Sequence, residues 1–210
     1  MAWRAGNIVL NPSPNAAQAR CLAETHIGLP EVLESRIQPP VPTPAPLGGW
    51  KIDGWVAWHW IEGEPAPERA GEILLAARTY HDLLAHMLYD PVFQERDDPW
   101  ARADRVAWGE AMPDYPAEYM AMLAPVFAEP VPELAVQRLH GDLTGNVVFA
   151  PDVAPGIIDA TLYWRPPAFA EAVILVDQGW FAPYIDLTPF ADTPELATMV
   201  PLAARRRFAD

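Results

Sequence analysis

Hydrophobic, β-favouring residues gather in two short runs near the start of the chain, and each run is interrupted by turn residues. Residues 3–10 (WRAGNIVL) predict a strand, with a turn at Ala5-Gly6-Asn7. Residues 50–61 (WKIDGWVAWHWI) predict a hairpin, because Asp53-Gly54 is a strong two-residue turn signal between aromatic runs. The first part of the chain is therefore predicted to be rich in β-structure.

The segments between and after these runs predict a helix, a connector and a hinge. Ser13-Pro14 suits the N-cap and first position of a helix, which should run through residues 16–23 and end near Gly28-Leu29-Pro30. The stretch PPVPTPAP, residues 39–46, predicts a polyproline-like connector. The tetrapeptide EGEP, residues 62–65, ends the β pattern and predicts a hinge.

Beyond the hinge the apolar residues change to helical spacing, with Ile73, Ala77, Tyr80 and Leu84 as the first example. Prolines separate the successive helical stretches from one another. The helices predicted in this part span residues 68–88, 102–108, 118–127, 168–181 and 194–208.

This order of elements predicts an α+β protein. Residues 1–62 form a small β-containing part, and residues 63–210 form a mainly helical part that also contains a β-hairpin. A chain of 210 residues, of which 51% are hydrophobic, is long enough to bury a core as one large domain or two modest lobes.

Charge and composition narrow the class of protein. The formal net charge of -14 argues against a nucleic-acid binder and fits a positively charged small substrate. The basic cluster Arg205-Arg206-Arg207 is interpreted as a solvated or cut helix end. No apolar run approaches a membrane span, no signal peptide is evident, and Cys21 is the single cysteine. A cytoplasmic protein without a membrane partner is expected, and the sequence predicts no oligomeric state.

The stretch RLHGDLTGNVVF, residues 138–149, carries the candidate chemistry. Residues 147–149 and 157–158 predict two strands of a hairpin, joined by a segment rich in turn residues. Asn146 enters the first strand and Asp159 leaves the second, so an antiparallel pairing makes these two ends neighbours. Asp142 precedes Asn146 by four residues and can loop back over the same end. Two carboxylates and a carboxamide are therefore predicted to converge.

Such a convergence suits a magnesium ion, which prefers oxygen ligands and is usually held by one or two carboxylates together with substrate phosphates. The remaining carboxylate could orient or deprotonate an attacking hydroxyl, as in kinase-type phosphoryl transfer. The bland alternative is an Asx-turn pair with a strand-end cap, which the convergence of three polar groups makes the weaker interpretation. His140 is interpreted as a hydrogen-bonded brace of the loop. No zinc spacing and no serine-hydrolase motif are present.

His140-Gly141-Asp142 with Asn146, followed by Ile157-Ile158-Asp159, resembles the catalytic loop and metal-binding aspartate of the aminoglycoside phosphotransferase-like proteins, which have a protein-kinase-like fold. The stretches DDPWARADRVAWGE and IIDATLYWRPPAFAEAVILVD are similar to an uncharacterised bacterial branch of that family. The resemblance makes residues 1–62 a partial N-lobe and residues 63–210 the C-lobe. It implies an ATP-dependent phosphotransferase acting on a hydroxyl of a small molecule.

The resemblance also implies individual roles. Asp142 would be the catalytic base or hydroxyl-orienting acid, and Asn146 and Asp159 would bind Mg²⁺. His140 would brace the loop. The residues that would face the adenine, mostly through backbone groups, are Trp60, Ile61 and Glu62.

Two further positions concern the nucleotide phosphates. Asn11 stands where the family has its phosphate-binding lysine, although an amide brings no positive charge. Glu24, on the first helix, is a candidate for the acid that pairs with that lysine; a solvated helix glutamate is the alternative. Lys51, the single lysine of the chain, falls on the later hairpin.

Other departures from the family pattern support a second hypothesis. The glycine-rich loop that covers the phosphates would precede Trp3, and the chain is expected to be truncated at both ends. The spacing from Asp142 to Asn146 is one residue shorter than in most kinases. The alternative function is therefore a kinase-like pseudoenzyme, or a truncated remnant, that binds nucleotide weakly or not at all.

Overall fold

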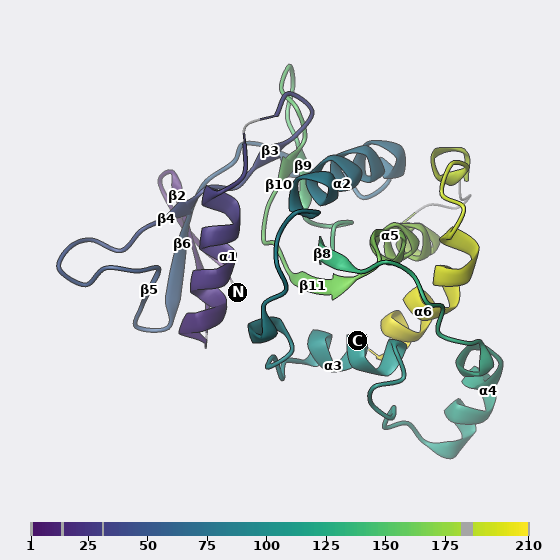
Figure 1. The fold of residues 1–210 in the computed structure, drawn as a ribbon. Helices are drawn as coiled ribbons and strands as arrows, with labels where there is room; N and C mark the ends of the chain where they lie inside the picture. The colour runs from purple at the N-terminus through teal and green to yellow at the C-terminus, as the bar shows by residue number, and fades with distance from the viewer. Residues whose placement is uncertain (1, 14, 31, 182–186, 210) are drawn as a thin grey trace.

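The structure is a computed structural model that describes residues 2–13, 15–30, 32–181 and 187–209. It has an α+β architecture in which most strands and one helix lie on one side, and the other helices lie on the other side with a two-stranded sheet among them (Figure 1). The helices are α1 (Ala16–Ile27), α2 (Ala70–Leu84), α3 (Pro99–Ala107), α4 (Ala117–Ala128), α5 (Pro167–Phe181) and α6 (Leu196–Ala209), with 3₁₀ turns η1 (Pro91–Phe93) and η2 (Thr188–Phe190). The strands are β1 (Trp3–Ala5), β2 (Ile8–Pro12), β3 (Arg36–Ile37), β4 (Pro40–Val41), β5 (Lys51–Ile52), β6 (Trp55–His59), β7 (Glu64–Pro65), β8 (Gln137–His140), β9 (Val147–Phe149), β10 (Gly156–Ile157) and β11 (Leu162–Arg165).

The first sheet has the order β1-β2-β6-β4, with β5 paired to β6. The predicted strand at residues 3–10 is split into β1 and β2, an antiparallel hairpin that turns at the predicted position. The hairpin of β5 and β6 is also confirmed. Asp53 and Gly54 have φ values of 47° and 88° at its turn, the left-handed conformation that such a two-residue turn requires.

The start of α1 corrects the prediction from Ser13-Pro14. The N-cap is Asn15, whose Oδ1 accepts hydrogen bonds from the backbone N–H groups of Ala17 at 2.8 Å and Gln18 at 3.2 Å. Ser13 lies before the cap: its N–H donates to the carbonyl of Gly54 at 2.7 Å, and its hydroxyl donates to the carbonyl of Asn15 at 3.2 Å. Pro14 lies outside the described residues. The helix ends at the predicted Gly28.

The proline-rich segment at residues 39–46 is not simply a connector. Its beginning forms β4, which pairs with β6 through Pro40 opposite Trp58 and Val41 opposite Ala57. Just before it, β3 pairs in parallel with β10. Proline tolerates such edge positions because a strand edge does not require its missing N–H group. The segment therefore ties the first sheet to the hairpin that carries the candidate site.

The hairpin predicted at residues 147–149 and 157–158 is confirmed as β9 and β10, which pair antiparallel with Val147 opposite Ile157. These strands lie in a second sheet of order β3-β10-β9-β7, and β8 pairs with β11 in a third. The main core forms where α2 packs against the hairpin and α5. Its fully buried side chains include Ile73, Tyr80, Leu84, Leu143, Val147, Ile157 and Ile174.

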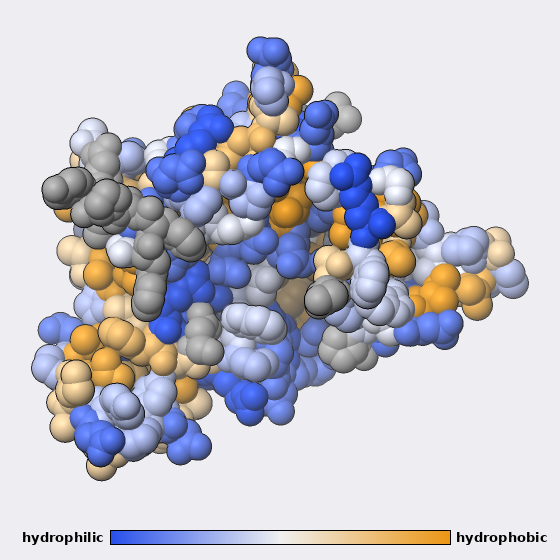
Figure 2. Space-filling model, turned by 180° about the vertical axis from the view of Figure 1, so that it is seen from behind, coloured by the Kyte–Doolittle hydropathy of each residue, from blue (hydrophilic) through white to orange (hydrophobic). Residues whose placement is uncertain are grey.

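The helices predicted after the hinge are all present, with ends that shift by a few residues. The start of α3 at Pro99 is fixed by Asp98, whose carboxylate accepts the N–H of Ala101 at 3.0 Å. The helix α4 buries no residue, and the side chains of Tyr119 and Met122 are exposed. Hydrophobic residues accordingly show at the lower left of Figure 2, where α4 lies. Among the described helices none is long and apolar enough to cross a membrane.

Candidate active site

The loop between β8 and β9 is organised around a buried histidine. The Nδ1 atom of His140 accepts the backbone N–H groups of Asp142 at 3.2 Å and Thr161 at 3.4 Å, while Nε2 lies 3.4 Å from the carbonyl of Ile158. These partners require the tautomer with the proton on Nε2. Burial lowers the pKa of His140, so the ring stays neutral and keeps this arrangement. The ring therefore joins the start of the β8–β9 loop to the segment that follows β10.

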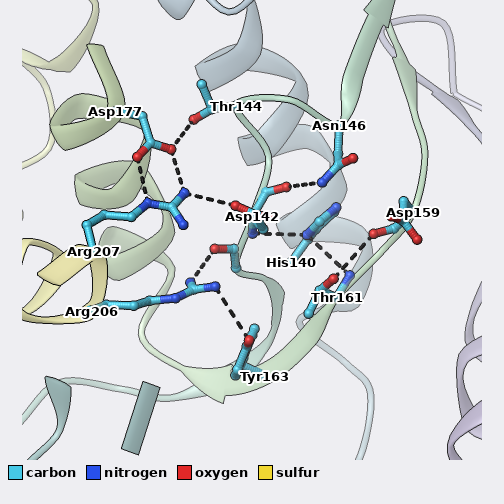
Figure 3. Close-up of polar contacts among 11 residues, drawn as sticks. His140, Asp142, Thr144, Asn146, Asp159, Thr161, Tyr163, Asp177, Arg206 and Arg207 are labelled. Atoms are coloured by element: carbon cyan, nitrogen blue, oxygen red, sulfur yellow. Dashed lines mark hydrogen bonds and ion pairs between the residues drawn. The ribbon is translucent and has the colours of Figure 1, made fainter. Parts of the chain in front are cut away.

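Asn146 and Asp142 are joined at the entrance of β9. Asn146 donates from Nδ2 to the backbone carbonyl of Asp142 at 2.7 Å, and its own carbonyl accepts the N–H of Ile158 at 3.0 Å (Figure 3). Because Nδ2 is engaged, Oδ1 is the atom through which this side chain could bind a cation. The antiparallel pairing of β9 and β10 brings Asp159 to the same end, as the strand pattern predicted.

Asp159 also contacts the first sheet. Its Oδ1 accepts a hydrogen bond from Nδ2 of Asn11 on β2 at 2.8 Å. Desolvation in the cleft raises the pKa of Asp159, the Asn11 bond opposes this shift, and the negative charge of Asp142 raises the pKa further. The two carboxylates are therefore close enough to repel each other. A cation between them would relieve that repulsion.

These residues line one cleft of about 420 Å³ between the first sheet with α1 and the β8–β9 loop. Residues from the first part of the chain that line it include Asn11, Gln18, Leu22, His26, Val56 and Trp58, and those from the second part include Phe93, Arg96, Trp100, Asp142, Asn146, Asp159 and Leu162. The lining combines apolar and aromatic side chains with a similar number of polar and charged ones, among them the carboxylates of Asp142 and Asp159. Such a cleft can hold a small molecule and present a hydroxyl to Asp142.

The residues expected to face an adenine do not line this cleft. The N–H of Trp60 donates to the carbonyl of Asn7 at 2.7 Å, and the guanidinium of Arg4 stacks on the indole of Trp60 at 3.8 Å. Ile61 is buried, and the carbonyl of Glu62 accepts from Arg36 at 2.9 Å. Two of the backbone groups assigned to the nucleotide are thus already hydrogen-bonded within the protein.

Glu24 is likewise not brought to the cleft. Its side chain is 61% exposed on α1, where it lies 4.0 Å from the guanidinium of Arg20. It does not reach Asn11, so the solvated-glutamate alternative describes its position.

The C-terminal arginines correct the interpretation of a solvated helix end. Arg205 and Arg206 are 3% and 0% exposed. Arg206 donates from Nη1 to the carbonyl of Gly141 in the β8–β9 loop, and its guanidinium lies 4.9 Å from the ring of Tyr163. Helical spacing from Met199 and Leu202 puts Arg206 on the apolar face of α6, a signal in the sequence that could have predicted its burial.

The residue Arg207 reaches the candidate catalytic carboxylate. Its Nη2 donates to Oδ1 of Asp142 at 2.8 Å, and Nε and Nη2 donate to the two carboxylate oxygens of Asp177 at 2.6 Å each (Figure 3). Burial alone would raise the pKa of Asp142, but the hydrogen bond and charge of Arg207 hold it below its usual range. Asp142 is therefore ionised at neutral pH. No pattern in the sequence predicted this contact.

The oxygen donors present fit a magnesium ion better than a metal that needs a complete protein cage. Within the described ranges no group of three or more His, Cys, Asp or Glu side chains could hold a metal. Asn146 and Asp159 offer one carboxamide and one carboxylate oxygen group at the end of the hairpin. This small set matches Mg²⁺, which usually completes its coordination with water and substrate phosphates.

Replacing Gly141 by alanine should destabilise the protein, whereas the same change at Gly145 should not. A Cβ at Gly141 would lie 2.6 Å from the ring of Tyr163 and 2.9 Å from Nη1 of the buried Arg206. Overpacking of this kind costs about 1–3 kcal/mol. A Cβ at Gly145, in the same loop, meets nothing within 4 Å. Urea titrations of both variants measure the difference, and equal stabilities would contradict the close packing of loop and α6.

Stability should fall on mild acidification because three buried histidines, His26, His81 and His140, stay neutral in the folded state. Burial lowers the pKa of His26 to about 4 and that of His81 to about 4, below the ordinary 6.5. The unfolded chain therefore binds protons first as the pH falls below 6.5, which removes about 1.4 kcal/mol per pH unit for each histidine until the folded-state pKa is reached.

Urea titrations between pH 7.5 and pH 5 measure this loss of stability. A free energy of unfolding that is constant from pH 7 to pH 5 would contradict the neutral buried state of these rings.

Comparison with solved structures shows which known proteins share the fold of this chain. No protein-family model and no curated protein matches the chain. Among solved structures, the aminoglycoside phosphotransferase APH(2″)-IIa in complex with gentamicin matches with a TM-score of 0.54 and 12% identity, covering 92% of this chain and 73% of that one. The apo form of a thermostable mutant of APH(4)-Ia has a TM-score of 0.54 and 14% identity, covering 99% and 81%. An aminoglycoside phosphotransferase from Alicyclobacillus acidocaldarius matches with a TM-score of 0.51 and 14% identity, covering 100% of this chain and 81% of that one.

At such low identities the likeness concerns the fold. The chain has the protein-kinase-like α+β fold of the aminoglycoside phosphotransferases, as its HGD and IID stretches predicted.

Proposed function

We propose that this protein is a small-molecule kinase that transfers a phosphoryl group from ATP to a hydroxyl of its substrate. The observation that carries the proposal is the presence of Asp142, Asn146 and Asp159 in one cleft of a kinase-like fold. Proteins with this fold that match the chain include a phosphotransferase solved with gentamicin, a small molecule. That likeness supports the class of reaction and leaves the acceptor to be found.

Each of the candidate site residues has a defined role in this proposal. Asp142 accepts a hydrogen bond from the acceptor hydroxyl and orients the hydroxyl oxygen toward the γ-phosphorus of ATP. It takes up the hydroxyl proton as the new oxygen–phosphorus bond forms, while the bond from the γ-phosphorus to the bridging oxygen breaks and ADP leaves. Asn146 and Asp159 hold Mg²⁺ through their oxygen atoms. When bound, the ion neutralises charge on the phosphate oxygens and aligns them. His140 keeps the N–H of Asp142 fixed and so maintains the direction of the loop.

Asn11 makes the proposed enzyme slower than one that has a lysine at this position. An amide supplies no positive charge to the nucleotide phosphates, and loss of one preorganised electrostatic contact costs about 10²–10³-fold in rate. The amide instead donates to Asp159 at 2.8 Å, while its Oδ1 is buried without a hydrogen-bond partner. A phosphate or its bound cation would have to displace this contact, so modest nucleotide affinity is part of the proposal.

The test is ATP turnover by the purified chain with Mg²⁺ and a panel of hydroxylated amines, sugars and neutral alcohols. We expect at least one acceptor to raise turnover above the rate of ATP hydrolysis, and chelation of Mg²⁺ to abolish it. The alternative, a kinase-like pseudoenzyme, is motivated by Asn11 and by the hydrogen-bonded backbone of Trp60 and Glu62.

A thermal-shift titration with Mg²⁺ and ATP separates these two functions, because a ligand that binds the folded state raises the melting temperature by mass action. A shift without turnover of any acceptor would favour the pseudoenzyme. Absence of both would exclude the kinase.

A further inference from the structure

The last helix supplies a cation that joins the candidate catalytic loop to α5. Arg207 lies near the end of α6, and Asp177 lies on α5. Their side chains are 17% and 6% exposed, whereas that of Asp142 is 33% exposed toward the cleft. The cation is thus largely withdrawn from solvent, and the carboxylate that it contacts is not. Partial burial makes such a bridge stronger than a surface ion pair.

The geometry of this bridge gives the two carboxylates different tasks. Arg207 binds Asp177 through Nε and Nη2, at 2.6 Å each, so the plane of the guanidinium is fixed by a two-point contact. The same Nη2 also reaches Oδ1 of Asp142 at 2.8 Å. A planar group held at one edge by Asp177 therefore sets the place at which Asp142 is bound.

Asp177 is itself held by the loop that it supports. Thr144 donates its hydroxyl to Oδ2 of Asp177 at 2.7 Å, and both side chains are buried. Arg206, the neighbour of Arg207, donates to the carbonyl of Gly141. The loop is thus fastened on either side of Asp142, at the backbone carbonyl of Gly141 and at the side chain of Thr144 (Figure 3).

We propose that Arg207 is a positioning residue of the active site: anchored by Asp177, it holds the Asp142 carboxylate in the direction that faces the acceptor hydroxyl. This inference rests on the proposed function for its chemical consequence and on the observed contacts for its geometry. Arginine is required because one ammonium group cannot make a two-point contact to Asp177 and still bind Asp142 with fixed geometry.

The kinetic test compares Arg207→Met and Arg207→Lys with Arg20→Met, a control at a 67% exposed arginine of α1. We expect Arg207→Met to lower kcat about 10²-fold, the effect of misplacing a catalytic group by about 1 Å, with the KM for ATP little changed. Arg207→Lys should have a kcat between those of Arg207→Met and the wild type. Arg20→Met should keep the wild-type kcat.

Asp177→Asn provides a second, smaller change at the anchor. Asp177→Asn should also lower kcat, by less than Arg207→Met does. The double variant should be no slower than Arg207→Met alone, because both changes release the carboxylate of Asp142. A wild-type kcat in Arg207→Met would overturn the proposal. The proposal would also be overturned if Arg207→Met lowered both kcat and the melting temperature and Arg207→Lys recovered neither.

Hydrogen exchange of the full chain separates this inference from the proposed function. Arg207→Met should speed exchange in residues 138–149 relative to Arg20→Met, because the loop loses its side-chain anchor. If the wild-type chain phosphorylates no acceptor but this exchange difference is present, the proposed function fails and the positioning of Asp142 stands. If the wild type is active and exchange and kcat are both unchanged in Arg207→Met, the positioning role fails and the function stands.

Discussion

Replacing Asp142 by asparagine is expected to lower the turnover of ATP with an acceptor by about 10²–10⁴-fold, the usual contribution of a positioned acid or base. Asparagine keeps the shape of the side chain and its hydrogen bond to Arg207 through Oδ1. It loses the negative charge that, in the proposed reaction, orients the hydroxyl and accepts its proton. The expected result is thus a fall in kcat with a smaller change in the KM for ATP, measured in a steady-state assay.

A matched variant shows whether this effect is specific. Asp82→Asn removes a carboxylate from the exposed face of α2 and should retain the wild-type rate. Because Asp142 is ionised and paired with Arg207, Asp142→Asn should also lower stability, and melting curves show whether the variant is folded at the assay temperature. Full activity in folded Asp142→Asn would exclude Asp142 from the reaction and remove the main support of the proposed function.

Replacing Gly63 by alanine is expected to lower the free energy of unfolding by about 2–6 kcal/mol. Its φ of 139° lies in a region that side chains rarely adopt, at a cost of about 1–3 kcal/mol. A Cβ at this position would also lie 2.9 Å from three backbone atoms of Phe149, the C, N and O, and such overpacking adds about 1–3 kcal/mol. Backbone atoms of a paired strand cannot move aside as a flexible side chain can.

The control for this change is Gly109→Ala. Gly109 also has a positive φ, 70°, but a Cβ there meets nothing within 4 Å. It should therefore cost only about 1 kcal/mol. Urea titrations give both values. A loss below about 1 kcal/mol for Gly63→Ala would mean that the segment before β7 can move away from β9 without loss of the fold.

The part of the site that could be predicted from the sequence is the part made by neighbouring residues. Asn146 and Asp159 flank a hairpin whose turn residues and short apolar runs are visible in the sequence. Antiparallel pairing of its two strands places these residues at the same end. The same holds for the turn at Asp53-Gly54. Local signals of this kind determine local geometry, so the predictions that rest on them agree with the structure.

The contacts that could not be predicted join residues that are far apart in the sequence. Asn11 and Asp159 are separated by 148 positions, and Arg207 and Asp142 by 65. No spacing rule links such positions without knowledge of the packing. The interpretation of the arginine cluster as a solvated helix end is wrong for a different reason. Charge alone predicts exposure, whereas the helical spacing of Arg206 from Met199 and Leu202 places it on the apolar face of α6.

The assembly of the cleft from both ends of the chain also bears on how the protein folds. Contacts across 148 and 65 residues require large loops to close before they contribute any stability, which slows folding. During synthesis the catalytic loop leaves the ribosome well before α6 does. Asp142 therefore has no guanidinium partner until the last helix has docked, and the ordering of this loop should be among the late steps of folding.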